Sequence, residues 1–439
     1  MKTNELISYI NEGNLGDKLL DIYMDKSKIP YQKDRYIQAV KSFVDLYGEA
    51  EVNIISAPGR TEVGGNHTDH QHGQVLAASI NDDAIAVVSK NDSGVVNIKS
   101  EGYDMITFSL DDIEKKDEEE GTTLALIKGV LKGCQDRGFN IGSFNAYITS
   151  DVLGGSGLSS SAAFETVIGN IISGLYNDMK IDAVTIAIIG QFAENKYFGK
   201  PCGLMDQMAC SVGSLCHIDF KDPSDPVIER IELDMDAVGY SLCITDTKGS
   251  HADLTPDYAA VPSEMKSVAA HFGKEVLIEV PEEEVVAAIP ELREKLGDRA
   301  VLRALHFYEE NHRVVNEATA LKSNDFSTFL KNVKASGDSS FKFLQNVYTN
   351  RDIEHQNVSV ALCISENVLG EDGGVSRVHG GGFAGTIQAF VKNEKVEEYK
   401  NALDAVFGEG ACAVLKIRKY GGILVILMIP CFVLCKLRR

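Results

Sequence analysis

The stretch "FNAYITSDVLGGSGLSSSAAFETVIGNIISGLY", Phe144 to Tyr176, predicts a strand, a loop rich in glycine and serine, and a helix in direct succession. Glycines let the backbone approach a ligand closely, and the start of a helix offers free N–H groups and the positive end of the dipole. The pattern is therefore typical of an anion site. A helix with an ordinary serine N-cap remains the alternative.

This loop matches neither of the two common phosphate-binding motifs. No lysine follows the glycines, as GxxxxGK[ST] requires, and Ser160 stands in place of the third glycine of GxGxxG. Because the loop carries no lysine, a triphosphate bound here would depend on the helix start and a divalent cation to balance its charge.

Outward from this unit, strands and helices alternate along the chain. Residues 1–50 read as helices ending at Gly48, a strand follows over 51–59, and two or three further strands occupy 74–100. Such alternation predicts an α/β or α+β protein. A strand pair reopens at 226–247, so we predict two domains, residues 1–235 and 236–439, the second holding a helical stretch over 281–344 and a strand–helix unit over 385–410.

Composition excludes several classes of protein. Lys and Arg number 43 against 64 Asp and Glu, a net charge of −21, which disfavours nucleic acid or an anionic membrane as a partner. Nine cysteines without CxxC spacing indicate reduced thiols rather than disulfides or zinc. The N-terminus lacks the apolar run of a signal peptide, so a cytoplasmic location is expected. Oligomeric state is not predicted.

The C-terminal segment "ILVILMIPCFVLC", Ile423 to Cys435, is apolar and precedes KLRR. A membrane-spanning helix needs about 20 such residues, and Pro430 interrupts the run. We therefore expect a final strand with an apolar overhang rather than a membrane anchor. A frameshift or cloning artefact at the end of the reading frame stays open, as does the role of this tail.

We expect the stretch "APGRTEVGGNHTDHQHG", Ala57 to Gly73, to be too polar and too flexible to form core. Its crowded side chains, His67, Asp69, His70 and His72, suggest zinc, but no second cluster supplies further ligands. Alternating donors and acceptors on a glycine frame suit a polyhydroxylated ligand better.

Two further segments carry candidate residues. In "YFGKPCGLMDQMACSVG" a helix stops at Gly199, and Asp206 lies among apolar neighbours. Asp206 is therefore either a helix-start cap or a functional carboxylate with a cationic partner, for which Arg60 is available. In "RVHGGGFAGTIQAFV" the glycines at 380–382 indicate either close approach to a ligand or a turn before a strand.

Together these four segments resemble the galactokinases of the GHMP small-molecule kinase family. That family's sugar motif GRxNxxGEHxDY is read here as GRTEVGGNHTDHQ, and its phosphate loop PxGxGLSSSA as LGGSGLSSSA. GIMDQ appears as GLMDQ and GGGFGG as GGGFAG, in the same order between Pro58 and Gly385. The resemblance covers most of the chain.

The resemblance implies an α+β, two-domain GHMP kinase fold, with an N-terminal ribosomal-protein-S5-like domain and a C-terminal ferredoxin-like α/β sandwich. It implies phosphorylation of the anomeric hydroxyl of galactose, with ATP as co-substrate and Mg²⁺ as cofactor, giving galactose 1-phosphate. Asp206 matches the catalytic base and Arg60 its cationic partner.

The same resemblance assigns the remaining site residues by position. The sugar ligands are Arg60, Asn66, His67, Asp69, Gly203, Asp206 and Tyr258. The nucleotide ligands are Gly154, Gly155, Ser156, Gly157, Leu158, Ser159, Ser160 and Ser161. The magnesium ligands are Ser161 and Glu194.

The chain departs from the family pattern at several points. The glutamate before the motif histidine is Asn66, the proline before the phosphate loop is Leu153, and the chain has no tryptophan, so the adenine pocket is left unassigned. Because of Asn66, one alternative function is a kinase of the same fold that acts on another sugar, N-acetylgalactosamine or L-arabinose. A non-catalytic galactose and ATP sensor is the second alternative.

Overall fold

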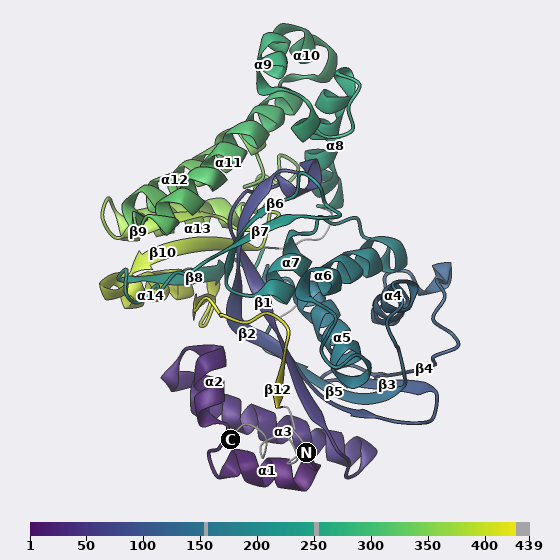
Figure 1. Ribbon diagram of the computed structural model, residues 1–439. Coiled ribbons are helices and arrows are strands. Elements are labelled where there is room, and N and C mark those ends of the chain that lie inside the picture. The colour runs from purple at the N-terminus through teal and green to yellow at the C-terminus, as the bar shows by residue number, and fades with distance from the viewer. Residues whose placement is uncertain (153–156, 250–253, 427–439) are drawn as a thin grey trace, which may run out of the picture.

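The computed structural model describes residues 1–152, 157–249 and 254–426 (Figure 1). Two sheets organise these residues. The first has eight strands, in the order β12 (Ile423–Ile426), β1 (Asn53–Gly64), β2 (Gln74–Lys90), β5 (Phe144–Ser150), β3 (Val95–Ser100) and β4 (Met105–Ser109), with β6 (Leu215–Asp219) paired to β2 and β7 (Val227–Ile231) to β6. The second has four antiparallel strands in the order β11 (Cys412–Leu415), β8 (Tyr240–Asp246), β10 (Thr386–Lys392) and β9 (Gly374–Val378).

Helices cover both faces of the first sheet. Successive residues of a strand point to opposite faces, so neighbouring residues of β1 contribute to different cores. Ile54 faces a core shared with α1 (Thr3–Asn11), α2 (Gly16–Tyr23) and α3 (Ile29–Tyr47). Its neighbour Ile55 faces a core shared with α4 (Thr123–Asp136), α5 (Ser160–Tyr176) and α6 (Ala183–Phe192). Figure 1 shows α1–α3 gathered at one end of the molecule, and α7 (Met205–Val212) lying beside α6.

The remaining helices follow β8 in the chain. They are α8 (Thr255–His271), α9 (Glu282–Ala287), α10 (Ile289–Leu296), α11 (Asp298–Lys322), α12 (Phe326–Ser339), α13 (Asn357–Leu369) and α14 (Val396–Phe407). Short turns of 3₁₀-helix are η1 (Lys26–Lys28), η2 (Asp69–Gln71), η3 (Asp117–Glu119), η5 (Leu277–Glu279) and η7 (Asn393–Lys395), and π-helical turns are η4 (Ala193–Phe198) and η6 (Ser340–Leu344). The predicted α+β class and the helical stretch over 281–344 are confirmed.

The domain boundary predicted after residue 235 lies between β7 and β8, hence between the two sheets. The end of the chain does not stay with the second sheet, however, because β12 pairs with β1. Residues Ile423–Ile426 form the strand expected at the start of the apolar tail, and residues 427–439 lie outside the described part. No helix within the described ranges is long and apolar enough to cross a membrane.

A buried ion cluster joins the N-terminal helices to the returning chain end. Asp83 on β2 is fully buried, 2.7 Å from Arg35 Nη1 on α3 and 3.0 Å from Arg418 Nη1, which lies between β11 and β12. Burial by itself would raise the pKa of Asp83, but the two guanidinium groups and a hydrogen bond from Ser56 lower it below its usual value. The cluster therefore holds three segments around one carboxylate.

Strand β1 is longer than the sequence predicts. The predicted strand ends at residue 59, yet β1 continues to Gly64 with register shifts on either side of Arg60. Gly59 is required because a Cβ there would lie 2.8 Å from the Leu158 carbonyl oxygen, and the Arg60 N–H donates to that same oxygen at 3.1 Å. The irregular strand thus carries Arg60 directly to the phosphate loop.

Candidate active site

The four motif segments, far apart in sequence, line one cavity of about 970 Å³. Residues from β1, the loop after it, the start of α5, the loop before α7, helix α8 and the glycine-rich loop between β9 and β10 all contribute. A space of this size and polarity accommodates a small-molecule ligand with several hydrogen-bonding groups. The four segments therefore meet at one site.

Arg60 and Asp206 form the charged centre of this cavity. Arg60 Nε lies 2.7 Å from Asp206 Oδ1, and Nη2 lies 2.9 Å from Oδ2, the bidentate geometry that makes such pairs strong. Arg60 is buried, whereas the Asp206 side chain is 35% exposed and reaches the cavity. The predicted pairing is confirmed.

Asp206 remains ionised in this setting. Burial would raise its pKa, but the Arg60 charge and hydrogen bonds from Arg60 and Ser159 hold the pKa below its usual value. The carboxylate is the second residue of α7, after the N-cap residue Leu204, and it does not cap the helix. The interpretation of Asp206 as a helix cap is therefore wrong.

The serine-led start of α5 also faces the cavity. Ser159 adopts a φ of +58° and donates its hydroxyl to Asp206 instead of capping the helix, so the ordinary N-cap interpretation is wrong as well. Gly157, Ser159, Ser160 and Ser161 line the cavity. Leu158 packs into a hydrophobic core, so only its backbone belongs to the loop. Gly154, Gly155 and Ser156 lie outside the described residues.

Asp69 and His67 line the part of the cavity formed by the loop after β1. Asp69 packs closely against Gly203, since a Cβ at residue 203 would collide with Asp69 Oδ2. Asp69 Oδ1 accepts the N–H of His70 at 2.8 Å. Burial and the nearby charge of Asp206 raise the pKa of Asp69 to about 6. Burial lowers the pKa of His67 to about 4, so its ring is neutral near pH 7, and Nε2 lies 3.1 Å from the Gly381 carbonyl oxygen.

Asn66 does not line the cavity, which does not fit its predicted role as a sugar ligand. Its fully buried amide donates to Glu62 Oε1 at 2.9 Å and to the Gly380 carbonyl at 2.7 Å. Glu62 lines the cavity instead and pairs with the buried Arg377 at 2.7 Å. The expectation that this stretch is too polar for core is also wrong, because most of its residues are buried and partners within the protein satisfy most of their polar groups, His70 Nε2 being an exception.

Glu194 and Ser161, the predicted magnesium ligands, lie close together. Glu194 Oε1 is 3.4 Å from Ser161 Oγ, and its other oxygen accepts from Gln207 at 2.7 Å. Glu194 belongs to the π-helical turn η4, a distortion that often occurs at functional sites. The described residues bring one set of three potential metal ligands together, Glu282, Glu309 and His312, and these do not line the cavity.

His379 and Lys200 are among the cavity residues that the sequence did not indicate. His379, before the glycine triplet, accepts the Glu62 N–H at 3.2 Å, and its Nδ1 lies 2.9 Å from Thr386 Oγ1. These two contacts join β1 to the second sheet. Lys200 lines the cavity beside Glu194. The sequence did carry a signal for Lys200, because this residue lies between Gly199 and Pro201 in the segment that also holds Asp206.

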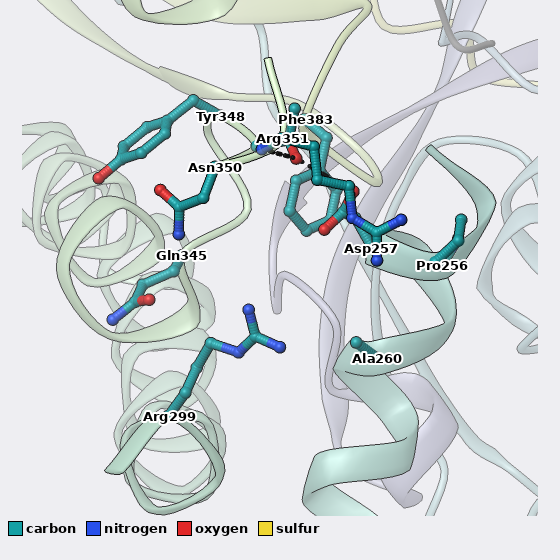
Figure 2. A pocket seen from close by; sticks show the side chains of 10 residues that line it. Pro256, Asp257, Ala260, Arg299, Gln345, Tyr348, Asn350, Arg351 and Phe383 are labelled. Atoms are coloured by element: carbon teal, nitrogen blue, oxygen red, sulfur yellow. Dashed lines mark hydrogen bonds and ion pairs between the residues drawn. The ribbon is translucent and has the colours of Figure 1, made fainter. Parts of the chain in front are cut away.

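Tyr258 lines the main cavity, and its hydroxyl donates to the Gly382 carbonyl at 2.8 Å. Its ring meets Phe383 edge-on, with centroids 5.3 Å apart. Phe383, with a φ of +58°, lines a second cavity of about 140 Å³. Figure 2 shows that cavity with the pair Arg351 and Asp257, whose charged atoms lie 3.4 Å apart. One loop therefore borders both cavities.

Comparison with known proteins agrees with this geometry. Residues 41–90 match the galactokinase galactose-binding signature, and residues 125–214 match the N-terminal domain of GHMP kinases. A galactokinase from Glaesserella parasuis is 32% identical over 363 residues, covering 82% of this chain and 91% of that protein. The chain belongs to the galactokinase family. A second relative, a galactokinase of Actinobacillus pleuropneumoniae, is 31% identical and covers 83% and 92%.

Solved structures of the galactokinase family and of wider GHMP kinases share the fold. The Lactococcus lactis galactokinase complexed with galactose superposes with a TM-score of 0.75 at 24% identity, covering 88% of this chain and 98% of that one. A mevalonate kinase gives a TM-score of 0.58 at 15% identity, covering 83% and 99%. The resemblance and the fold predicted from sequence are confirmed.

Proposed function

We propose that this protein is an ATP-dependent galactokinase that phosphorylates the anomeric hydroxyl of galactose. The observation that carries the proposal is the bidentate pair of Arg60 and Asp206, which opens on a cavity bordered by the start of α5. Family membership supports it, since the relatives are galactokinases and the Lactococcus lactis galactokinase is complexed with galactose.

Asp206 is the proposed base. In this step the anomeric oxygen forms a bond to the γ-phosphorus, the bond from that phosphorus to the bridging oxygen of ADP breaks, and the hydroxyl proton passes to Asp206. Arg60 keeps Asp206 ionised, and its Nη1 donates to the Gly157 carbonyl at 2.5 Å. The guanidinium thus fixes the base relative to the phosphate loop and offsets developing negative charge.

Ser161 and Glu194 are the proposed magnesium ligands. A carboxylate and a hydroxyl are hard oxygen donors of the kind that Mg²⁺ prefers, and their oxygens lie 3.4 Å apart. When bound, the ion would supply positive charge to the phosphates. Gln207 donates to the second oxygen of Glu194 and holds the carboxylate in orientation.

Asp69, His67, Tyr258 and the backbone at Gly203 are the proposed sugar contacts. Asp69 offers an acceptor, and neutral His67 keeps a ring nitrogen that can bond a hydroxyl. Asn66 is withdrawn from this set, and Glu62 lines the cavity in its neighbourhood. Asn66 was the residue that motivated a kinase of the same fold for N-acetylgalactosamine or L-arabinose, so this second candidate has no direct contact in its support, and the choice of sugar in the assay below tests it.

Sugar affinity is expected to depend on pH through Asp69. Its pKa of about 6 means that the acceptor form is lost as pH falls, so the KM for galactose should rise about tenfold between pH 8 and pH 5. Steady-state KM measured across this range checks it. Asp69→Asn should give a raised KM that no longer varies with pH, whereas a flat KM in the wild type would contradict the assignment.

A coupled ADP-release assay tests the proposed function, with and without Mg²⁺, on galactose, N-acetylgalactosamine and L-arabinose. We expect turnover with galactose that requires the cation. Turnover confined to another sugar would support the second candidate. Binding of galactose and ATP without release of any sugar phosphate would instead support the sensor alternative.

A further inference from the structure

Lys200 is a cation of the cavity that the proposed function leaves without a role. Its Nζ lies 3.2 Å from Glu194 Oε1, and its side chain is 63% exposed while that of Glu194 is 4% exposed. Gly199, with a φ of +82°, and Pro201 flank it, and the proline ring restricts the backbone on the C-terminal side. Lys200 lines the cavity together with Ser159, Ser160, Ser161 and Asp206.

The ammonium group lies where the proposed cation would bind. Ser161 Oγ and Lys200 Nζ approach the same oxygen, Glu194 Oε1, at 3.4 Å and 3.2 Å. A divalent cation held by Ser161 and Glu194 would repel an ammonium at this distance. The exposed four-carbon stem gives Lys200 freedom to leave Glu194 while staying inside the cavity.

The phosphate loop itself supplies no lysine, because serines follow its glycines. Four phosphate charges of ATP would then face Arg60, the start of α5 and the proposed cation. Arg60 is already engaged bidentately by Asp206. The nearby Lys200 is therefore the side chain best placed to add a positive charge at the phosphates.

We propose that Lys200 is a phosphate-contacting residue with two positions. In the empty enzyme it neutralises the buried Glu194, and when the divalent cation and ATP enter, it moves to the β- and γ-phosphate oxygens. The proposal rests on the proposed function for the identity of the nucleotide and cation. Lys200, in the loop before α7, then has the role that a lysine inside the glycine-rich turn has in other phosphate loops.

Lys200→Met tests the proposal, because methionine keeps the length of the side chain and removes its charge. With Mg²⁺ present, ATP affinity measured by calorimetry should fall about tenfold, the loss expected for a charge-assisted hydrogen bond, while AMP affinity should be unchanged. Without nucleotide, Mn²⁺ used as the probe should bind several-fold more tightly, because the competing ammonium is gone. Lys200→Arg should retain most of the ATP affinity.

Lys196→Met is the matched control, since Lys196 is exposed on the adjoining turn η4 and does not line the cavity. The proposal is overturned if Lys200→Met matches this control in either ATP or Mn²⁺ affinity. Both readouts measure binding and not turnover, so they test the role of Lys200 separately from the proposed galactokinase activity. A wild type that binds ATP but phosphorylates no sugar would refute the proposed function and leave the result for Lys200 standing.

Discussion

Asp206→Asn is expected to lower kcat by about 10²–10⁴-fold, the usual contribution of a positioned general base. The amide is nearly isosteric and keeps one oxygen for Arg60, but it cannot accept the hydroxyl proton. Because Arg60 and Ser159 hold the pKa of the native carboxylate low, wild-type activity should persist to mildly acid pH before this group titrates. Steady-state kinetics with saturating galactose and Mg²⁺-ATP measures the loss.

The control for this variant separates chemistry from folding. Asp225→Asn changes an exposed aspartate on the loop between β6 and β7 and should leave kcat unchanged. Thermal melting should show Asp206→Asn folded, and calorimetry should show galactose and ATP affinities within a few-fold of the wild type. A kcat within tenfold of the wild type would mean that Asp206 only orients the hydroxyl.

Asp83→Asn is expected to lower the free energy of unfolding by about 3–5 kcal/mol, the cost of leaving buried charges without their partner. Asp83 is fully buried and serves two guanidinium groups, Arg35 and Arg418. An amide has one acceptor oxygen where the carboxylate has two, and it carries no charge. Urea denaturation followed by circular dichroism measures the change.

Asp82→Asn is the control for that experiment, because the adjacent aspartate pairs with the partly exposed Lys28 at 2.9 Å. Such a pair contributes about 0–1 kcal/mol. The pKa of Asp83 is lowered in the folded state, so its contribution is complete above the unfolded pKa of about 3.9 and disappears as pH falls below it. The difference between Asp83→Asn and the wild type should therefore shrink in acid. Equal effects of both variants would contradict the structural role.

The strand, loop and helix around the phosphate loop could be predicted because their signals are local. Apolar spacing predicts α5, and Gly48 and Gly199 mark helix ends through the positive φ that they adopt. The pairing of Arg60 with Asp206 could be predicted from the sequence for a different reason. A carboxylate among apolar residues needs a cation, and the resemblance indicated which one.

Asn66 could not be placed from the sequence. Its position in the sugar motif suggested a ligand contact, yet its amide is used by Glu62 and Gly380, the latter in a loop more than 300 residues away in the chain. The direction of a short polar side chain depends on which partners the fold brings near it. Leu158 illustrates the same point, because a loop residue packs into the core.

The sequence by itself determined the order of elements, the family and the residue types available for chemistry, since periodicity, glycine punctuation and motif order depend on neighbours along the chain. Tertiary structure decided the irregular course of β1 past Gly59, the return of β12 to the first sheet and the contact of Asn66 with Gly380. Each depends on contacts between segments distant in sequence, and their energies arise only when the sheets and helices pack together.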